Sequence, residues 1–245
     1  MPDDGPMARG QASGRSMSQN LFVSALQKVT AGQLSFNELI ATAQQLTASG
    51  QTDPARQLYQ VWIAMNGEHP LVFIAHFNCS TLLQQQGDHA GAEIALRSAL
   101  AANADFAPAH INLGSALERR GAVKDAIDQW RAGLERMTTI SGDAIEYKTT
   151  LLKQISRVLT DAQQHEAAEA ALIQCLDVRP EARDVLEQYA AVRLAQCKWP
   201  IAGALPSRLS RRDFVARFHP LSACAYADDP LMHLGAANQY VQNVT

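Results

Sequence analysis

Four carboxamide side chains recur at a regular spacing along the middle of this chain. The interval that separates Asn78 from Asn112 also separates Gln154 from Gln188 further on. Each carboxamide has an oxygen that accepts hydrogen bonds and an NH2 group that donates two. Such groups, repeated along one surface, can bond to the backbone of an extended peptide whatever its side chains are. The chemistry that they suggest is binding rather than catalysis.

A plainer explanation of the same spacing stays open. The position could simply favour a polar residue that faces solvent, as Asn often does in repeats with no known ligand. We expect a peptide-binding role for Asn78 and Asn112, which are the stronger candidates, and for Gln154 and Gln188.

Histidine and carboxylate residues do not form a metal site by their spacing. His165, Glu166 and Glu169 resemble the H-E-x-x-H zinc pattern, but the second histidine is missing. Zinc needs ligands one turn apart on one helix face, so the pattern predicts the start of a solvated helix. His76 and His110 recur at the same interval as the two asparagines, and we interpret them as structural residues between helices.

The cysteines are predicted to be reduced thiols of a helical core. The four of them form no C-x-x-C pair, and most lie in apolar context: Cys79, Cys175, Cys197 and Cys224. The 14 glycines show no G-x-G-x-x-G or P-loop pattern that would cradle a phosphate group. We therefore predict no catalytic, cofactor-binding or metal-binding residue, and no catalysis by this chain alone.

The elements that position these side chains come from an internal repeat. Small or apolar residues and one turn glycine return with a period of about 34 residues, which is that of the tetratricopeptide repeat, a pair of helices joined by a turn. Small residues let the two helices approach closely, and a bulky residue fills the groove between them. The matching sets are Cys79, Ser80, Leu83, Gly87, Ala92, Leu96 and Ala99, and then Leu113, Gly114, Leu117, Gly121, Ala126, Trp130 and Gly133.

The same pattern extends outward in both directions and predicts the fold class. Helix pairs are expected near 36–66, 73–103, 107–137 and 149–179, with an inserted loop around 138–144 and a closing helix over 183–196. The predicted fold is all-α, a right-handed α-solenoid of tetratricopeptide repeats. Because one such unit cannot bury its apolar face alone, stacking of roughly three or more is needed.

Four regions follow from this pattern. Residues 1–19 are rich in Gly, Ser, Met, Gln and Pro and are predicted to be disordered. Residues 20–35 form an N-terminal capping helix, and residues 36–196 form about four and a half repeats. Residues 197–245 form a linker and helices, in which Trp199 is expected to plug the last repeat. A final helix begins at Pro230, and its apolar stripe predicts a further domain after it.

Composition excludes several classes of partner. The net charge of −3 is too small to indicate nucleic acid or an anionic membrane. No apolar run reaches the roughly 18 residues of a membrane helix, and no signal peptide opens the chain. We expect a cytoplasmic protein whose partner is another protein or an extended peptide on the concave face, and in which oligomers can form through convex helices.

The order of motifs after the repeats resembles a known family. Gln196, Cys197, Trp199 and Pro200 are followed by Pro220-Leu221-Ser222-Ala223 and by Asp228-Asp229-Pro230-Leu231. Repeats followed by such a junction resemble bacterial members of the O-linked N-acetylglucosaminyltransferase family, of the SPINDLY type. In that family the junction leads into a two-lobed glycosyltransferase of the Rossmann-like type.

The resemblance implies that the repeats select a protein acceptor for sugar transfer by lobes that would follow residue 245. An asparagine ladder on the inner surface of that family's repeats binds the acceptor, which matches Asn78 and Asn112 here. None of the family's catalytic residues is present to carry over. Two interpretations remain: the non-catalytic front part of a glycosyltransferase, or a stand-alone scaffold whose final helix folds back on the last repeat.

Overall fold

A computed structural model describes residues 19–138, 141–203, 205–206, 209–210, 213–214 and 230–244. These residues are helical or form turns and loops, and none of them lies in a strand. The chain divides into two compact units, residues 1–120 and 121–245, which we describe separately. The fold class predicted from the sequence, an all-α solenoid of helix pairs, is confirmed.

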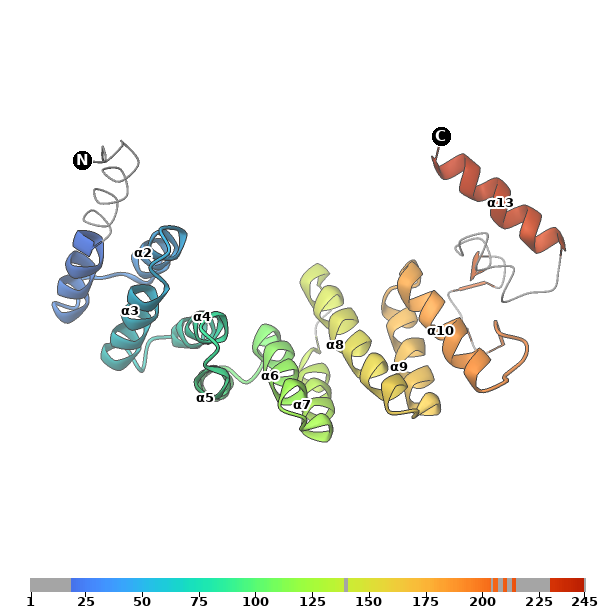
Figure 1. The fold of residues 1–245 in the computed structure, drawn as a ribbon, viewed down its shortest axis with the longest axis horizontal. Coiled ribbons are helices and arrows are strands. Elements are labelled where there is room, and N and C mark those ends of the chain that lie inside the picture. Colours follow the sequence, from blue (N-terminus) through green and yellow to red (C-terminus); the bar gives the residue numbers. More distant parts are fainter. Residues whose placement is uncertain are drawn as a thin grey trace, which may run out of the picture. The chain divides into compact units, whose positions relative to one another are not determined.

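The described part of the first unit consists of a helical run followed by helices α2 to α6 (Figure 1). Consecutive helices pack on one another, and the most extensive packing is between the two helices of one pair, α4 and α5. The run covers residues 19–30, and the helices that follow are α2 (Phe36–Ala48), α3 (Thr52–Met65), α4 (Val72–Gln85), α5 (His89–Ala102) and α6 (Ala107–Arg119).

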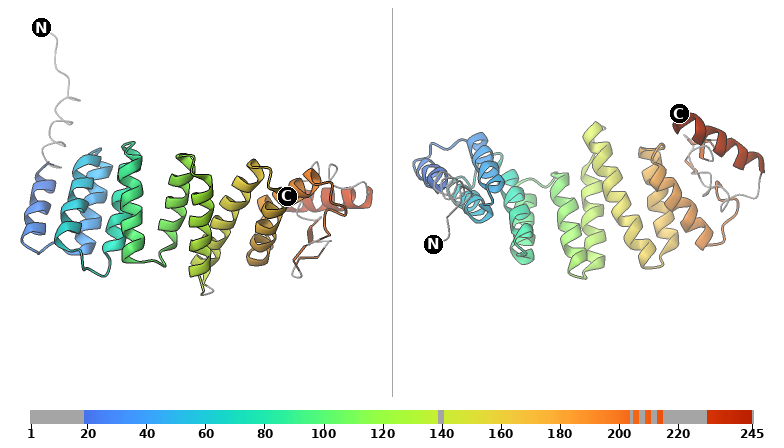
Figure 2. Two further views of the ribbon diagram at one scale, coloured as in Figure 1. Left: turned by 90° about the horizontal axis from the view of Figure 1, so that it is seen from below. Right: turned by 45° about the horizontal axis from the view of Figure 1, so that its top comes forward.

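The second unit shows the same kind of arrangement (Figure 2). Its helix α9 packs against both α8 and α10, so this second helix of a repeat is covered by first helices. The helices are α7 (Val123–Arg136), α8 (Gly142–Asp161), α9 (His165–Val178), α10 (Arg183–Ala195) and α13 (Pro230–Val244).

Helix α8 is longer than the repeat pattern predicted. It begins at Gly142, whereas the pattern placed its start near 149 and a loop over 138–144. The reason is local, because the Ser141 side chain accepts a hydrogen bond from the Ala144 N–H at 3.2 Å and caps an added turn. The added turns are anchored because Ala144 is buried.

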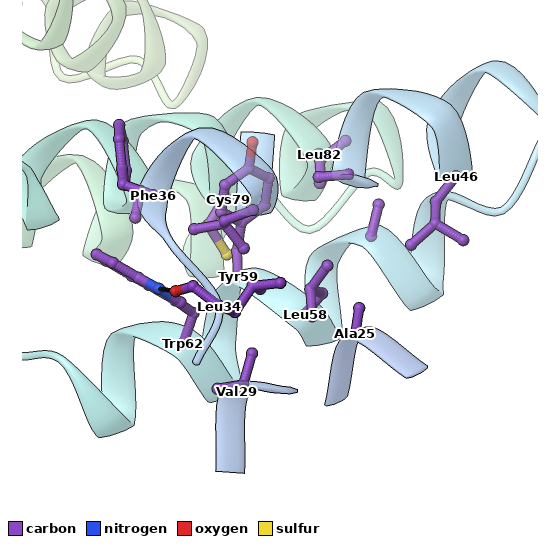
Figure 3. Close-up of a cluster of buried hydrophobic side chains, with 14 of the residues drawn as sticks. Ala25, Val29, Leu34, Phe36, Leu46, Leu58, Tyr59, Trp62, Cys79 and Leu82 are labelled. Atoms are coloured by element: carbon purple, nitrogen blue, oxygen red, sulfur yellow. Dashed lines mark hydrogen bonds between the residues drawn. The ribbon is translucent and has the colours of Figure 1, made fainter. Parts of the chain in front are cut away.

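The core of the first unit is built from alanines, leucines and a few aromatic rings. Ala92, Ala95 and Ala99 of α5 are buried, and their small side chains permit close helix packing. Trp62 is also buried, and its Nε1 donates a hydrogen bond to the Leu34 carbonyl at 3.3 Å (Figure 3). The run 19–30 contributes Ala25 and Val29 to the same cluster.

The segment after α10 folds back onto the last repeat, but not through the residue that we expected. Trp199 is 63% exposed, so the prediction that it plugs the repeat is wrong. Phe214 packs there instead, with its ring edge against Tyr189 at a centroid distance of 6.1 Å. Ile201 and Leu209 are buried as well. We call residues 197–214, as far as the structure describes them, the C-terminal cap.

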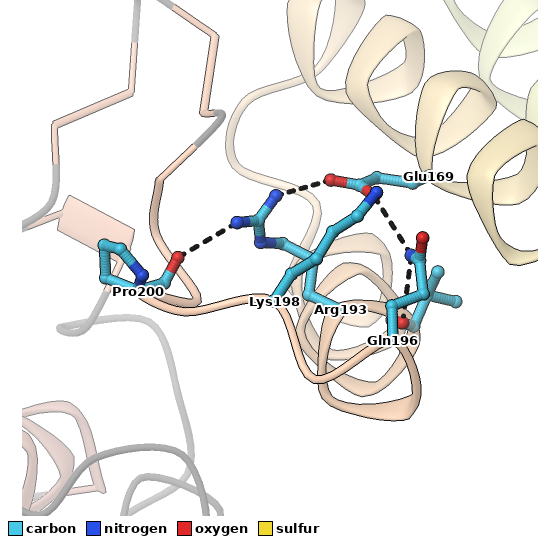
Figure 4. A network of polar contacts seen from close by, with 6 residues as sticks. Glu169, Arg193, Gln196, Lys198 and Pro200 are labelled. Carbon is cyan, nitrogen blue, oxygen red and sulfur yellow. Dashed lines mark hydrogen bonds and ion pairs between the residues drawn. The ribbon is translucent and has the colours of Figure 1, made fainter.

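A buried polar network attaches the cap to the repeats (Figure 4). The Glu169 side chain of α9 is 7% exposed, and its carboxylate accepts hydrogen bonds from Arg193 at 2.5 Å, Gln196 at 3.0 Å and Lys198 at 2.8 Å. A second Arg193 nitrogen, Nη2, donates to the Pro200 carbonyl at 3.1 Å. One carboxylate therefore joins α9, α10 and the cap.

Several sequence predictions fall outside the described residues. They concern the disorder predicted for residues 1–19, of which only Gln19 is described and is helical, and also the motifs between 215 and 229, Cys224 and the cap of the final helix by Asp229. Helix α13 does begin at Pro230, and its Leu234, Tyr240 and Val241 are exposed.

Candidate peptide-binding site

A groove in the first unit lies between two first helices of neighbouring repeats, α2 and α4. Its volume is about 410 Å³, and Tyr59 of α3 also reaches it. Its lining combines small or apolar side chains with polar, uncharged ones. The lining residues are Ala43, Gln44, Thr47, Ala48, Tyr59, Asn78, Thr81 and Leu82.

Asn78 is half-buried in this groove and is held by Tyr59. Its Nδ2 donates a hydrogen bond to the Tyr59 hydroxyl oxygen at 3.2 Å. Tyr59 itself is 4% exposed, and burial raises the pKa of its hydroxyl by more than the Asn78 hydrogen bond lowers it. Because this bond fixes the carboxamide, the Asn78 Oδ1 remains as an acceptor for a backbone N–H of a ligand.

The two threonines of the groove use their protons within their own helices. Thr47 Oγ1 donates to the Ala43 carbonyl at 2.8 Å, and Thr81 Oγ1 donates to the Asn78 carbonyl at 2.7 Å. Their oxygens keep lone pairs that can accept from a ligand. The groove therefore offers fixed acceptors beside apolar side chains, which suits an extended backbone.

Asn112 occupies the equivalent place in α6. It is half-buried, and within the part of the chain that the structure describes its side chain makes no hydrogen bond. The structure thus pairs Asn78 with Tyr59 and leaves Asn112 available. The repeat pattern in the sequence gave no sign that Tyr59 orients Asn78, because this contact joins helices of two neighbouring repeats.

The two glutamines lie in the second unit and differ from each other. Gln154 of α8 is half-buried, and its Oε1 accepts from Arg157 at 2.9 Å. Gln188 of α10 is exposed and lines a groove of about 220 Å³ between α8 and α10. The groove is completed by Arg157, Thr160, Asp161, His165, Ala191, Val192 and Ala195.

The remaining candidates have structural surroundings. His110 is buried, with its Nε2 2.9 Å from the Ala104 carbonyl, and burial lowers the pKa of His76. Burial raises the pKa of the Cys79 and Cys175 thiols to about 11, so both are protonated at neutral pH. The expectation of a solvated helix start at residues 165–169 is wrong for Glu169, which is buried and ion-paired because its face of α9 meets α10.

No cluster of three or more metal-ligating side chains occurs in the described ranges. In the same ranges no helix combines the length and the hydropathy that crossing a bilayer requires.

Comparison with known proteins identifies the fold. No protein-family model matches the sequence, and no curated protein matches it either. Solved structures do match. A tetratricopeptide repeat protein from Parabacteroides merdae is 16% identical, with a TM-score of 0.57, over 84% of this chain and 72% of that protein.

Two further structures match over most of this chain. The C-terminal part of a repeat protein from Cytophaga hutchinsonii is 14% identical, with a TM-score of 0.60, over 95% of this chain and 88% of that one. YrrB, described as a tetratricopeptide repeat protein with an unusual peptide-binding site, is 12% identical, with a TM-score of 0.53, over 89% of this chain and 97% of that one. These similarities show the tetratricopeptide fold.

Proposed function

We propose that this chain is a protein-interaction scaffold that binds an extended peptide along the first helices of its repeats. The observation that carries the proposal is the groove between α2 and α4, where Tyr59 orients the Asn78 carboxamide. Asn112, Gln154 and Gln188 occupy the same place in the later repeats. Backbone hydrogen bonds to such groups give affinity, and the apolar side chains give contact area. The peptide-binding site named for YrrB adds support by analogy.

The test is a quantitative pull-down with the full chain. Proteins retained by the wild type should be lost or strongly reduced when Asn78→Ala is combined with Asn112→Ala. Each lost neutral hydrogen bond contributes about 1 kcal/mol, which corresponds to roughly a fivefold change in affinity. Gln57→Ala is the matched control, because Gln57 is exposed on the second helix α3 and does not line the groove. If the double variant binds every partner as the wild type does, the proposal is contradicted.

A finer form of the proposal makes the chain the acceptor-selecting part of a protein O-GlcNAc transferase-like enzyme in the cytoplasm. Its support is the junction sequence that begins at Gln196 and the exposure of Leu234 and Val241 on α13. The alternative is a stand-alone scaffold with the same groove.

The mass of the native protein in its source cells separates these two forms. The chain itself has a mass of 26.6 kDa. A band far above this mass in an immunoblot against the repeats would favour the enzyme. Sugar transfer by the full-length protein would then be measured with and without the Asn78→Ala and Asn112→Ala changes. A band at the mass of the chain would favour the scaffold.

A further inference from the structure

The two grooves, one in each unit, are lined from the same positions of the repeat. In each case one wall is the end of a first helix and the other is the middle of the next first helix. Thr47 and Thr160 hold one shared position, and both donate to a carbonyl four residues earlier at 2.8 Å. The other equivalent pairs are Gln44 with Arg157, Ala48 with Asp161, Asn78 with Gln188, Thr81 with Ala191 and Leu82 with Val192.

The grooves differ in charge at these equivalent positions. Among the described residues, those that line the groove between α2 and α4 are all uncharged. The groove between α8 and α10 has Arg157 and Asp161, whose Nη1 and Oδ2 atoms lie 3.6 Å apart, and also His165. Two of the differences in charge, Gln44 against Arg157 and Ala48 against Asp161, lie along one face of the first helix.

The uncharged lining has a consequence for the ligand. A charged side chain that enters the first groove would lose hydration, and the described residues that line the groove would give it no counter-charge. An uncharged segment loses less, because its backbone can bond to Asn78 and its side chains can pack on Ala43 and Leu82. The groove thus favours peptide segments that carry no charged side chain.

We propose that the α2–α4 groove is a subsite for extended segments without charged side chains, and that Gln44 and Ala48 set this preference. The inference rests on the proposed function, since it concerns the same groove. The ligand class is a peptide with small or apolar uncharged side chains, bound through its backbone.

The test uses the full chain and short synthetic peptides of equal length that carry a fluorescent label. One set contains only Ala, Ser, Thr, Gly and Val, and two further sets carry Glu or Lys at every third position. In fluorescence anisotropy titrations, the uncharged peptides should bind at least tenfold more tightly than their charged counterparts. Charged peptides that bind as tightly, or a complete lack of binding by the uncharged set, would overturn the inference.

A variant with charged residues at positions 44 and 48 tests whether these two positions set the preference. Gln44→Arg with Ala48→Asp places the second groove's ion pair in the first groove, at two exposed helix positions. The variant should bind the uncharged peptides at least fivefold more weakly and keep its circular dichroism spectrum. The matched control is Ala90→Arg with Ile94→Asp, which places the same pair of charges at two exposed positions of α5 outside the groove and should leave that affinity within twofold. An unaltered affinity in the graft variant contradicts the inference.

The Asn78→Ala and Asn112→Ala variant separates this result from the proposed function. If it weakens the peptides while the wild type binds the charged and uncharged sets equally tightly, the proposed function stands and the charge preference fails. If it weakens none while the graft does, the groove discriminates charge but the carboxamides do not bind the backbone, and the proposed function fails.

Discussion

Individual residues act in this protein through the partners that fix them. The Asn78 carboxamide is oriented because its NH2 group donates to the Tyr59 hydroxyl, and Tyr59 is fixed because it is buried. Glu169 can be buried because Arg193, Gln196 and Lys198 all donate to it. In both cases a polar group is satisfied by residues far away in the sequence.

The substitution Tyr59→Phe tests the orienting role directly. It removes one hydroxyl and keeps the ring, so the free energy of unfolding should change by no more than about 1 kcal/mol. The Asn78 carboxamide loses its fixed orientation, and the affinity for uncharged peptides should fall about fivefold in anisotropy titrations. An affinity equal to that of the wild type would show that Asn78 needs no such support.

Removing one partner of the buried ion pair should lower the free energy of unfolding more than replacing both partners by apolar residues. Arg193→Met leaves the Glu169 carboxylate with fewer donors and should lower the free energy of unfolding by roughly 3–5 kcal/mol in urea titrations. Glu169→Leu combined with Arg193→Met removes both charges and should cost clearly less. Lys153→Met is the control, because its pair with Asp184 is exposed and contributes at most about 1 kcal/mol. Equal losses in the control and in Arg193→Met would contradict this account.

The Glu169 carboxylate should also make the stability of the protein depend on pH. Burial acts to raise the pKa of Glu169, but the hydrogen bonds from Lys198, Arg193 and Gln196 outweigh it and hold the pKa below its usual 4.5. A lowered pKa means that the stabilisation is fully present above 4.5 and is lost as the pH falls below that value. Urea unfolding should therefore show that the difference in stability between wild type and Glu169→Gln shrinks in this acidic range. A difference that stays constant through it would argue against the ion pair.

At the scale of elements, the turn inside each repeat requires one left-handed residue. Gly50, Gly87 and Gly121 have positive φ at this turn, between 78° and 84°. In the turn between α8 and α9 the same place is held by Gln163, with a φ of 59°, and after α10 it is held by Cys197, with a φ of 54°. A side chain in this conformation costs roughly 1–2 kcal/mol, so the turn geometry is imposed by the packing of the two helices.

Two opposite substitutions check this requirement. Gly87→Ala should lower the free energy of unfolding by about 1 kcal/mol, since a Cβ there meets no atom within 4 Å and only the backbone is strained. Cys197→Gly should raise it by roughly 0.5–1 kcal/mol, because the relief of strain exceeds the entropic cost of glycine. Thermal denaturation of both variants against the wild type measures the signs, and equal signs would refute the argument.

Most of the elements could be predicted because the repeat pattern is local. The small residues and the turn glycines indicate the helix pairs wherever the period holds, as between Gly87 and Gly121. The pattern failed where the period is interrupted, at the start of α8, because a cap by Ser141 is decided by one local hydrogen bond. It also could not place Trp199 or Glu169, whose exposure depends on how the cap folds onto α10.

For the candidate site the sequence could identify the carboxamides but not their surroundings. Their spacing gave Asn78 and Asn112, whereas the Asn78 contact with Tyr59 requires α3 and α4 in place. The uncharged lining of the groove, to which Gln44 and Ala48 contribute, likewise becomes visible only when α2 and α4 are adjacent.

At the scale of the whole chain, an α-solenoid needs its end covered. The C-terminal cap covers the last repeat, because its Ile201, Leu209 and Phe214 are buried and Phe214 packs on Tyr189 of α10. Terminal repeats without such a cover are prone to association. The cap therefore belongs to the folded repeat region rather than to a flexible linker.

Truncation tests this boundary. A chain that ends at Gln196 should lose several degrees of thermal stability and elute as aggregates in size-exclusion chromatography. A chain that ends at Phe214 keeps the cap and should behave as the full chain does. If both truncations are equally stable and monodisperse, the cap does not contribute to the repeat stack.

The proposed function requires that carboxamides on the first helices bind a peptide backbone. Nuclear magnetic resonance of the side-chain NH2 groups of the full chain tests it most directly, with one of the uncharged peptides as the titrant. We expect the Asn78 and Asn112 side-chain signals to shift with the same binding constant as the anisotropy gives. Binding that shifts other signals and leaves these two unchanged would contradict it.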